Sequence, residues 1–288
     1  MSRNRMSITL WLFLSSLFLT ALFAYPTVLI HGILSNKGEM AELQTYLQED
    51  GGLVYNIEIG DGEMTSIFDS MNKQCELVAE AIQKLDLSEN KTNLIGISQG
   101  GLLARCYVER YSAEVIPVNS LITIATPHMG IYYQMDGIIG LAGFAIPDYW
   151  KDPYNYWIYY TSNTFLSYLN NEKIHVNWAR YKASLLSISH FVMIWSSIDS
   201  VIVPLESAQF EFYDILTAER EKKLVIVPLN ESFTYKYDAI GLRTLNESNR
   251  LHMYQFDCQH NRFKLPSCFA QLKNKNNRTL IGVIKEYL

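Results

Sequence analysis

The sequence predicts an α/β fold in which a mostly parallel central sheet carries helices on both faces. Short apolar runs typical of buried strands alternate along the chain with amphipathic stretches of helical spacing. Strands joined in this way by helices pair in parallel through right-handed crossovers. A glycine-bracketed serine, GISQG at 96–100, lies between one such strand and its helix. With 288 residues, 49% of them hydrophobic, the chain is long enough for one domain with a sizeable core.

Strands and helices alternate regularly through the first half of the chain. The run YPTVLI is typical of a buried strand, and the run LVYNIEI alternates like a half-buried one. The intervening stretches place apolar residues on one helical face. We therefore expect strands at 25–30, 53–59 and 93–95 and helices at 39–48, 67–85 and 102–110.

The segment from Lys91 to Tyr111 is the centre of the predicted fold. An apolar run precedes the G-x-S-x-G motif, and an amphipathic pattern follows it. Strand, tight turn and helix form the context of a nucleophile elbow in the α/β-hydrolase fold. Residues two before and two after the serine crowd each other in such a turn, so glycine fits there because it lacks Cβ. Ser98 would lie at the helix N-terminus, where backbone N–H groups favour negative charge.

Further strands and helices are expected after the elbow. Apolar or alternating runs predict strands at 118–125, 190–195 and 251–257, and a short strand or buried loop at 224–229. Helices are expected at 163–171, at 279–287 and in the aromatic segment that precedes Asp214.

Residues 131–181 differ from the rest of the chain and are expected to form a cap-like insertion. They are rich in aromatic residues and glycine and show no strand period. We assign them to a single α/β-hydrolase domain spanning 25–288. Their apolar side chains would line a groove for a long acyl chain or form the small core of an ordinary subdomain, and composition favours neither.

A serine nucleophile of this fold needs an acid after a late strand and a histidine after the last strand. Asp199 follows the expected strand 190–195, and His260 follows the expected strand 251–257. Ser98, Asp199 and His260 therefore occur in hydrolase order. Other aspartates also lie between the serine and the histidine, but they fall in the insertion, in other loops or too close to His260: Asp136, Asp148, Asp152, Asp214, Asp238 and Asp257.

The oxyanion of acyl transfer requires two backbone N–H donors. The first expected strand ends in His31-Gly32, so the N–H of Ile33 would be one donor. The N–H of Gln99, directly after the nucleophile, would be the other. We expect local hydrogen bonds to satisfy the His31 side chain. His128, after the strand 118–125, would line the site or cap its own turn.

The N-terminus predicts entry into the secretory pathway. Basic residues precede an apolar run at 8–23, and Ala24 offers a cleavage site, so residues 1–24 resemble a signal peptide. An uncleaved membrane anchor is the alternative, but the first expected strand follows at once. No second long apolar run suggests a stable membrane span. Four glycosylation sequons fit this route and would lie on surface loops: those at Asn90, Asn230, Asn246 and Asn277.

Charge and cysteine content argue against several other classes. The net charge is −5 without a block of like charge, whereas nucleic-acid binding calls for a basic patch. The cysteines show no metal-ligand spacing, and no cofactor or metal is expected. Cys258 and Cys268 flank a loop and are the best candidates for a disulfide. Cys106, on the apolar side of its helix, is expected to be a buried free thiol.

Six stretches give the sequence a specific resemblance to the palmitoyl-protein thioesterase family of α/β-hydrolases. These stretches are VLIHGI (28–33), NLIGISQGGLLAR (93–105), ITIATPHMG (122–130), FLSYLNNE (165–172), DSVIVPLESAQFEFYD (199–214) and IGLRTL (240–245). The segments ATPHMG (125–130) and RTL (278–280) resemble the branch known as palmitoyl-protein thioesterase 2. The resemblance implies a lysosomal enzyme, and a secreted one is the alternative.

The resemblance implies a serine thioesterase that acts on long-chain acyl thioesters of proteins, peptides or coenzyme A through an acyl-enzyme. A lipase or carboxylesterase with the same Ser-Asp-His triad is the first alternative. A non-catalytic lipid-binding protein with the same fold is the second.

Overall fold

The computed structural model describes residues 25–85, 87, 91–133 and 145–288. Its centre is a six-stranded sheet in the order β2-β1-β3-β4-β5-β8, and every neighbouring pair of strands is parallel. The strands are β1 (Thr27–Ile30), β2 (Val54–Ile57), β3 (Thr92–Ile97), β4 (Val118–Ile124), β5 (His190–Trp195) and β8 (Leu251–Gln255). The predicted parallel α/β fold is confirmed.

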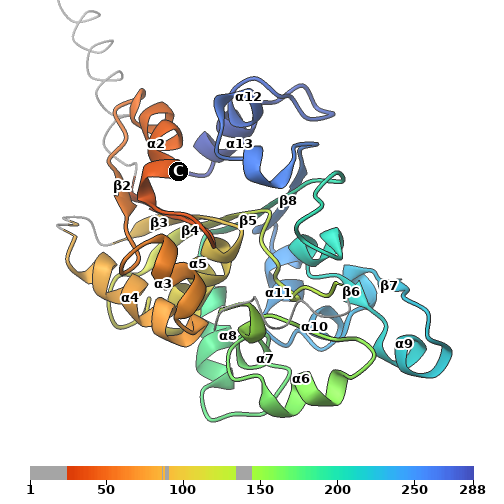
Figure 1. Ribbon diagram of the computed structural model, residues 1–288. Helices are drawn as coiled ribbons and strands as arrows, with labels where there is room; N and C mark the ends of the chain where they lie inside the picture. The colour runs from red at the N-terminus through yellow and green to blue at the C-terminus, as the bar shows by residue number, and fades with distance from the viewer. Residues whose placement is uncertain (1–24, 86, 88–90, 134–144) are drawn as a thin grey trace, which may run out of the picture.

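Helices cover both faces of this sheet (Figure 1). One face carries α2 (Ala41–Gln48), α12 (Pro266–Phe269) and α13 (Leu280–Lys285). The other carries α4 (Met71–Gln83), α5 (Gln99–Arg110) and α8 (Trp178–Leu186). Alternate strand residues supply the two cores: Leu94 packs on the α5 side, whereas Ile95 packs on the α2 side. This alternation follows from the two-residue period of a strand.

Short elements fill the two long connections on the α5 side of the sheet. Between β4 and β5 lie η3 (Ile146–Asp148), α6 (Tyr156–Ser162), α7 (Leu166–Leu169) and α8. Between β5 and β8 lie η4 (Leu205–Gln209), β6 (Phe212–Tyr213), α9 (Ile215–Glu221), β7 (Ile226–Val227), η5 (Leu229–Glu231), α10 (Phe233–Lys236) and α11 (Leu242–Glu247). The remaining elements are η1 (Lys37–Met40), α3 (Glu63–Phe68) and η6 (His260–Arg262). The cap role of 131–181 stays a prediction.

The prediction of one long helix at 67–85 is wrong in one respect, because this part of the chain belongs to two helices, α3 and α4. The first, α3, ends at Phe68, and Asp69 has extended backbone angles. Ser70 then caps α4, since its hydroxyl accepts a hydrogen bond from the Lys73 N–H. The apolar spacing continues across the break, so periodicity alone did not reveal it.

Two other expectations are corrected on the α5 side. The aromatic residues before Asp214 form the strand β6, which pairs antiparallel with β7, so they are not helical. Asp214 instead caps α9 and accepts a hydrogen bond from the Thr217 N–H. Cys106 is not a free thiol, because it forms a disulfide with Cys75 of α4. This bond joins α4 to α5 within one helical layer.

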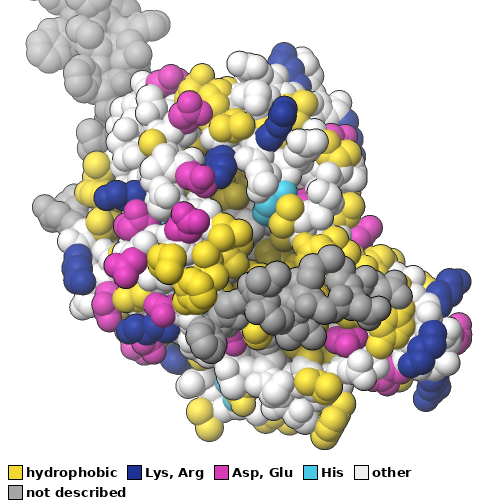
Figure 2. All heavy atoms as spheres, viewed as in Figure 1, with side chains coloured by type: hydrophobic (Ala, Val, Ile, Leu, Met, Phe, Trp, Pro, Cys, Tyr) yellow, Lys and Arg dark blue, Asp and Glu magenta, His cyan; other side chains and the backbone are white. Residues whose placement is uncertain are grey.

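Two further observations bear on the sequence predictions. On the face shown in Figure 2, acidic and basic side chains are interspersed rather than grouped by sign. Within the described residues, no helix combines the length and apolarity needed to cross a bilayer. The expected signal peptide at 1–24 lies outside the described residues.

Candidate active site

Ser98 occupies a strained turn between β3 and α5. Its backbone has φ 56° and ψ −127°, a conformation that residues other than glycine rarely adopt. A Cβ on Gly96 would lie 2.3 Å from the Gly100 carbonyl oxygen, and one on Gly100 would lie 2.3 Å from that of Ile30. The two glycines of the motif are therefore required by backbone contacts, as the sequence predicted.

Three side chains from distant loops meet at this turn. Nε2 of His260 is 2.9 Å from the Ser98 hydroxyl, and Nδ1 of His260 is 2.7 Å from Oδ2 of Asp199. All three side chains are largely buried. Because a carboxylate oxygen only accepts, Nδ1 carries a proton, which leaves Nε2 free to accept one from the serine. This arrangement can perform nucleophilic acyl transfer.

Hydrogen bonds hold the Asp199 turn against the His260 loop. Oδ1 of Asp199 accepts from the N–H groups of Val201 and Ile202, which directs Oδ2 to the histidine. The buried Ser196 hydroxyl accepts from the N–H groups of Ile198 and Cys258. Ser196 therefore links the two loops that carry the acid and the base. No sequence pattern pointed to this residue, although it directly follows β5.

A disulfide closes the His260 loop from the other side. Cys258 and Cys268 are bonded, which confirms the predicted pairing. The bond spans η6 and α12 and encloses His260. It therefore restricts the backbone that carries the histidine.

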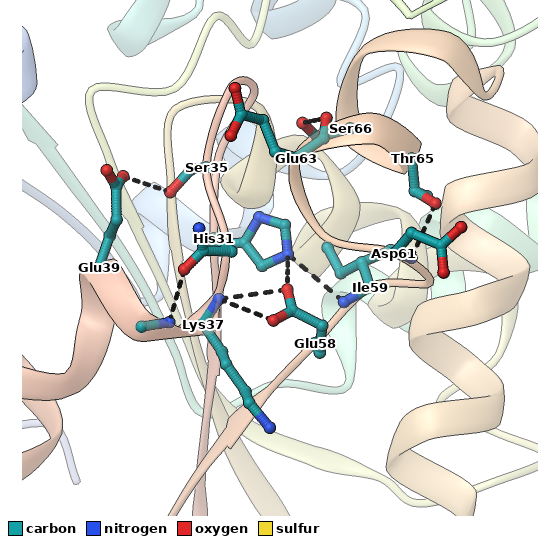
Figure 3. A network of polar contacts seen from close by, with 12 residues as sticks. His31, Ser35, Lys37, Glu39, Glu58, Ile59, Asp61, Glu63, Thr65 and Ser66 are labelled. Atoms are coloured by element: carbon teal, nitrogen blue, oxygen red, sulfur yellow. Dashed lines mark hydrogen bonds and ion pairs between the residues drawn. The ribbon is translucent and has the colours of Figure 1, made fainter.

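The loop after β1 is fixed at both ends by one carboxylate (Figure 3). Nε2 of His31 lies 3.1 Å from Oε1 of Glu58, and the Lys37 N–H donates to both Glu58 oxygens. His31 Nδ1 also lies 3.0 Å from the Gly32 carbonyl oxygen. Burial lowers the pKa of His31, and the hydrogen bond to the Gly32 backbone and the Glu58 charge only partly oppose this. Local contacts thus satisfy the His31 side chain, as expected.

The predicted oxyanion donors are the N–H of Gln99, which directly follows the serine, and that of Ile33, next to Gly32, whose added Cβ would lie 3.2 Å from the Ser98 Cβ. Among the described residues, neither the Ile33 nor the Gln99 N–H donates a hydrogen bond to the protein. Gln99 is the first residue of α5, so its N–H stands at the positive end of the helix dipole. Their role in holding an oxyanion stays a prediction.

The Gln99 side chain ties the elbow to its surroundings. Its amide nitrogen donates to the Ser66 carbonyl and to Oε1 of Gln74, and its oxygen accepts from the Tyr149 hydroxyl. Gln99 thereby joins the elbow to α3, α4 and the segment before α6.

An apolar pocket of about 330 Å³ lies beside the Asp199 turn. The Tyr132 N–H, between the lining residues Ile131 and Tyr133, donates to the Val203 carbonyl, which places the start of the pocket wall against the segment that follows Asp199. Burial, with a smaller effect of the nearby Asp199 charge, raises the pKa of Tyr133 to about 12. The pocket is lined by Ile131, Tyr133, Ile146, Pro147, Trp150, Asp152, Asn155, Ile158, Tyr159, Ser162 and Asn163.

His128 does not reach the serine. Its Nε2 lies 2.9 Å from the Thr123 hydroxyl, and Nδ1 lies 3.3 Å from an Arg105 nitrogen. Burial lowers the pKa of His128 well below its usual value, and the Arg105 charge adds to this. The imidazole is therefore neutral and belongs to a buried network rather than to the site.

The other described aspartates considered between Ser98 and His260 are also engaged elsewhere, and Asp152 accepts hydrogen bonds from the Tyr154 N–H and the Asn155 amide. Asp257 accepts hydrogen bonds from the Ser197 hydroxyl and the Gln255 amide. Asp238 is buried and pairs with Lys182. Asp148 accepts from the Met71 N–H. Asp136 lies outside the described residues.

Three of the four expected glycosylation sites can be placed. Asn230, Asn246 and Asn277 are exposed, whereas Asn90 lies outside the described residues. Asn246 belongs to α11 and Asn230 to η5, so neither lies in the surface loop that was expected. Their glycosylation stays a prediction.

Comparison with known proteins decides the family. The model of the family described as palmitoyl protein thioesterase matches residues 26–260. The chain belongs to the palmitoyl protein thioesterase family. This confirms the resemblance seen in the sequence motifs and places the chain in a family of thioester hydrolases.

Individual members of this family align over most of the chain. Palmitoyl-protein thioesterase 3 of Dictyostelium discoideum is 34% identical over 82% of this chain and 84% of its own length. Palmitoyl-protein thioesterase 1 of Caenorhabditis elegans is 28% identical over 82% and 86%. Lysosomal thioesterase PPT2 homolog of Drosophila melanogaster is 27% identical over 86% and 90%. The similar identities to the last two leave the branch a prediction.

Proposed function

We propose that this chain is a serine thioesterase that hydrolyses long-chain fatty-acyl thioesters through an acyl-enzyme. The observation that supports this most directly is the continuous hydrogen-bond chain from the Ser98 hydroxyl through His260 to Asp199, in a member of a thioesterase family. Its acyl carriers would be S-acylated proteins or peptides, or coenzyme A.

In the first half-reaction, Ser98 Oγ attacks the thioester carbonyl carbon while His260 Nε2 takes the hydroxyl proton. Asp199 stabilises the imidazolium that forms. The N–H groups of Ile33 and Gln99 donate to the oxyanion of the tetrahedral intermediate. Collapse of the intermediate breaks the C–S bond, and the acyl group stays on Ser98 Oγ. The departing thiolate takes the proton from His260, so the product leaves as a thiol and His260 is neutral again.

In the second half-reaction, water replaces the thiolate. His260 takes a proton from the water as its oxygen attacks the acyl carbon, and the same oxyanion donors hold the second intermediate. The C–Oγ bond then breaks, Ser98 regains its proton, and the fatty acid leaves. A thiolate is a good leaving group, so proton donation by His260 matters less in the first half-reaction than in amide hydrolysis.

The acyl chain would occupy the apolar pocket beside the Asp199 turn. Its volume of about 330 Å³ lies in the range of ligand pockets, roughly 300–1,000 Å³. Its lining from Trp150, Ile158 and Tyr159 offers hydrocarbon and ring surface. The sequence left two hypotheses for residues 131–181, an acyl-chain groove and a subdomain with its own small core. The apolar lining of this pocket favours the groove.

The setting of the reaction is also proposed. The Drosophila relative carries the word lysosomal in its name, and the sequence predicts a signal peptide at 1–24 and glycosylation at its sequons. A lysosomal or secreted enzyme fits these features and the two disulfides.

The test is hydrolysis of palmitoyl-CoA and of an S-palmitoylated peptide by the wild-type protein and by Ser98→Ala. Turnover of either thioester that is lost in Ser98→Ala supports the proposal and identifies the preferred carrier. An oxygen-ester analogue is assayed in parallel. Ester cleavage without thioester cleavage would indicate a lipase or esterase instead. A fluorophosphonate probe that labels wild type but not Ser98→Ala would exclude the non-catalytic alternative.

A further inference from the structure

Ser66 of α3 is buried, and its two oxygen atoms bind the two segments beside the nucleophile. Its hydroxyl oxygen accepts a hydrogen bond from the Leu34 N–H at 3.0 Å and donates one to the Glu63 carbonyl at 2.6 Å. Figure 3 shows Ser66 and Glu63 on the same short helix. The Ser66 carbonyl oxygen accepts from Nε2 of Gln99 at 2.9 Å. One residue therefore contacts both the loop after β1 and the elbow.

The contact with Leu34 fixes the backbone directly after one proposed oxyanion donor. Leu34 has φ 53°, in the left-handed region that residues other than glycine rarely adopt. Such a conformation persists only where contacts hold it, and the Ser66 hydroxyl holds the Leu34 N–H. On the other side of Ile33, Gly32 lies against the elbow, since its added Cβ would be 3.1 Å from the Ile97 carbonyl oxygen. The Ile33 N–H thus lies between two fixed residues.

The contact with Gln99 fixes the residue that carries the other proposed donor. Ser66 belongs to the last turn of α3, where carbonyl groups lack partners within the helix. The side-chain amides of Gln99 and Gln74 donate to its carbonyl oxygen instead. Gln99 is 1% exposed, so water does not compete for this contact. Its buried side chain therefore orients the residue whose backbone N–H directly follows Ser98.

We propose that Ser66 is a positioning residue that holds the N–H groups of Ile33 and Gln99 at the spacing the oxyanion requires. Such donors stabilise a transition state because they are aimed in advance at the oxyanion, about 2.7–3.1 Å away. The two donors lie on separate segments, and Ser66 is hydrogen-bonded to both segments. The inference rests on the proposed function in one respect, because it requires an oxyanion. Thioester and oxygen-ester hydrolysis share that requirement.

Ser207 provides a matched control for a purely structural role. It is buried as well, and its hydroxyl accepts from the Met129 N–H at 3.0 Å and donates to the Gly130 carbonyl at 2.6 Å. These distances equal those at the Ser66 hydroxyl. Among the described residues, no hydrogen bond of Ser207 reaches the loop after β1 or the elbow. Alanine at either position leaves one backbone N–H without its partner, so both changes should lower the melting temperature.

The test compares wild type, Ser66→Ala and Ser207→Ala in the hydrolysis of palmitoyl-CoA. Two inhibitors separate the transition state from the ground state. Palmityl trifluoromethyl ketone adds to the Ser98 hydroxyl and gives a hemiketal whose oxyanion resembles that of the tetrahedral intermediate. S-Hexadecyl-CoA is a thioether that has no carbonyl at the reacting position and forms no oxyanion. Thermal unfolding of each protein measures stability separately.

We expect Ser66→Ala to lower kcat about tenfold and to change KM by less than about twofold. This is part of the roughly 10²–10³-fold loss that follows removal of a whole oxyanion donor. The inhibition constant of the ketone should rise by about the same factor, because it reports on transition-state binding. The inhibition constant of the thioether should not change. Ser207→Ala should lower the melting temperature and leave kcat and the ketone constant as in wild type.

Two results would overturn the proposal. The first is an unchanged kcat and ketone inhibition constant in Ser66→Ala. The second is an equal loss of kcat in Ser66→Ala and Ser207→Ala, which would show a general loosening of the fold. A wild type that cleaves only oxygen esters would contradict the proposed thioesterase function instead. The same comparison on the oxygen ester would then decide the role of Ser66.

Discussion

Oε1 of Glu58 lies 3.1 Å from Nε2 of His31, and the two oxygens of the same carboxylate share a bifurcated hydrogen bond from the Lys37 N–H. One side chain from the end of β2 therefore holds both ends of the loop that presents Ile33. This contact is the basis of the first prediction.

Removal of this carboxylate should impair turnover more than substrate binding. We expect Glu58→Ala to lower kcat by about tenfold with little change in KM, because an oxyanion donor acts mainly on the transition state. Glu58→Gln should recover part of the loss, since it keeps an oxygen that can accept from Lys37. Steady-state kinetics on palmitoyl-CoA tests this. A fall in melting temperature with kcat unchanged would mean that Glu58 only stabilises the fold.

Substitution of an elbow glycine should damage the fold itself. A Cβ on Gly100 would stand 2.3 and 2.4 Å from the carbonyl oxygens of Ile30 and His31. We expect Gly100→Ala to lower the free energy of unfolding by several kcal/mol, which is about the cost of a severe clash in a protein core. Gly282→Ala in α13 is the control, because its Cβ meets only the Thr279 hydroxyl at 3.0 Å. Urea unfolding of both variants measures the difference, and comparable midpoints would contradict the argument.

The two disulfides should contribute differently. Cys75 and Cys106 close a loop of 31 residues between two packed helices, so Cys75→Ala, Cys106→Ala should cost about 3–4 kcal/mol of stability. Cys258 and Cys268 enclose the shorter loop that carries His260. We expect Cys258→Ser, Cys268→Ser to lower kcat more and stability less. Thermal unfolding and kinetics of both pairs test this, and the same effect from each pair would refute it.

The buried carboxyl group of Glu109 should make the free energy of unfolding fall as the pH rises from 4.5 to about 8. Burial raises the pKa of Glu109 to about 8, although Arg105 and Arg110 oppose the shift. An acid whose pKa is higher in the folded state binds more protons there than in the unfolded state. Burial of Glu109 therefore costs the protein no stability below pH 4.5, where both states are protonated, and the free energy of unfolding falls as the pH rises from 4.5 to about 8.

The variant Glu109→Gln isolates this effect. It removes the titrating group while keeping a side chain of similar shape. We expect its stability to change less than that of wild type between pH 5 and pH 8, by on the order of 1 kcal/mol or more. Urea unfolding at both pH values measures the change. Parallel curves for the two proteins would show that Glu109 stays paired and ionised throughout.

Much of the architecture could be predicted because burial imposes a period on each element. Strand residues such as Leu94 and Ile95 face opposite cores, and that two-residue alternation is visible in the sequence. The break at Ser70 was not visible, since the apolar spacing continues across it. The strand at Phe212 was mistaken for a helix, because its partner Val227 lies far along the chain.

The sequence by itself indicated the strands of the central sheet in their order, the glycines of the elbow and the resemblance to the family. These depend on local sterics and on periods of a few residues, which neighbouring residues encode. Only the tertiary structure decided that Cys106 meets Cys75, that Ser196 joins the Asp199 and His260 loops, and that Glu58 holds the loop after β1. The disulfide joins two helices that pack side by side on the sheet, and the other contacts join loops at the carboxyl ends of parallel strands. No local pattern in the sequence records such contacts.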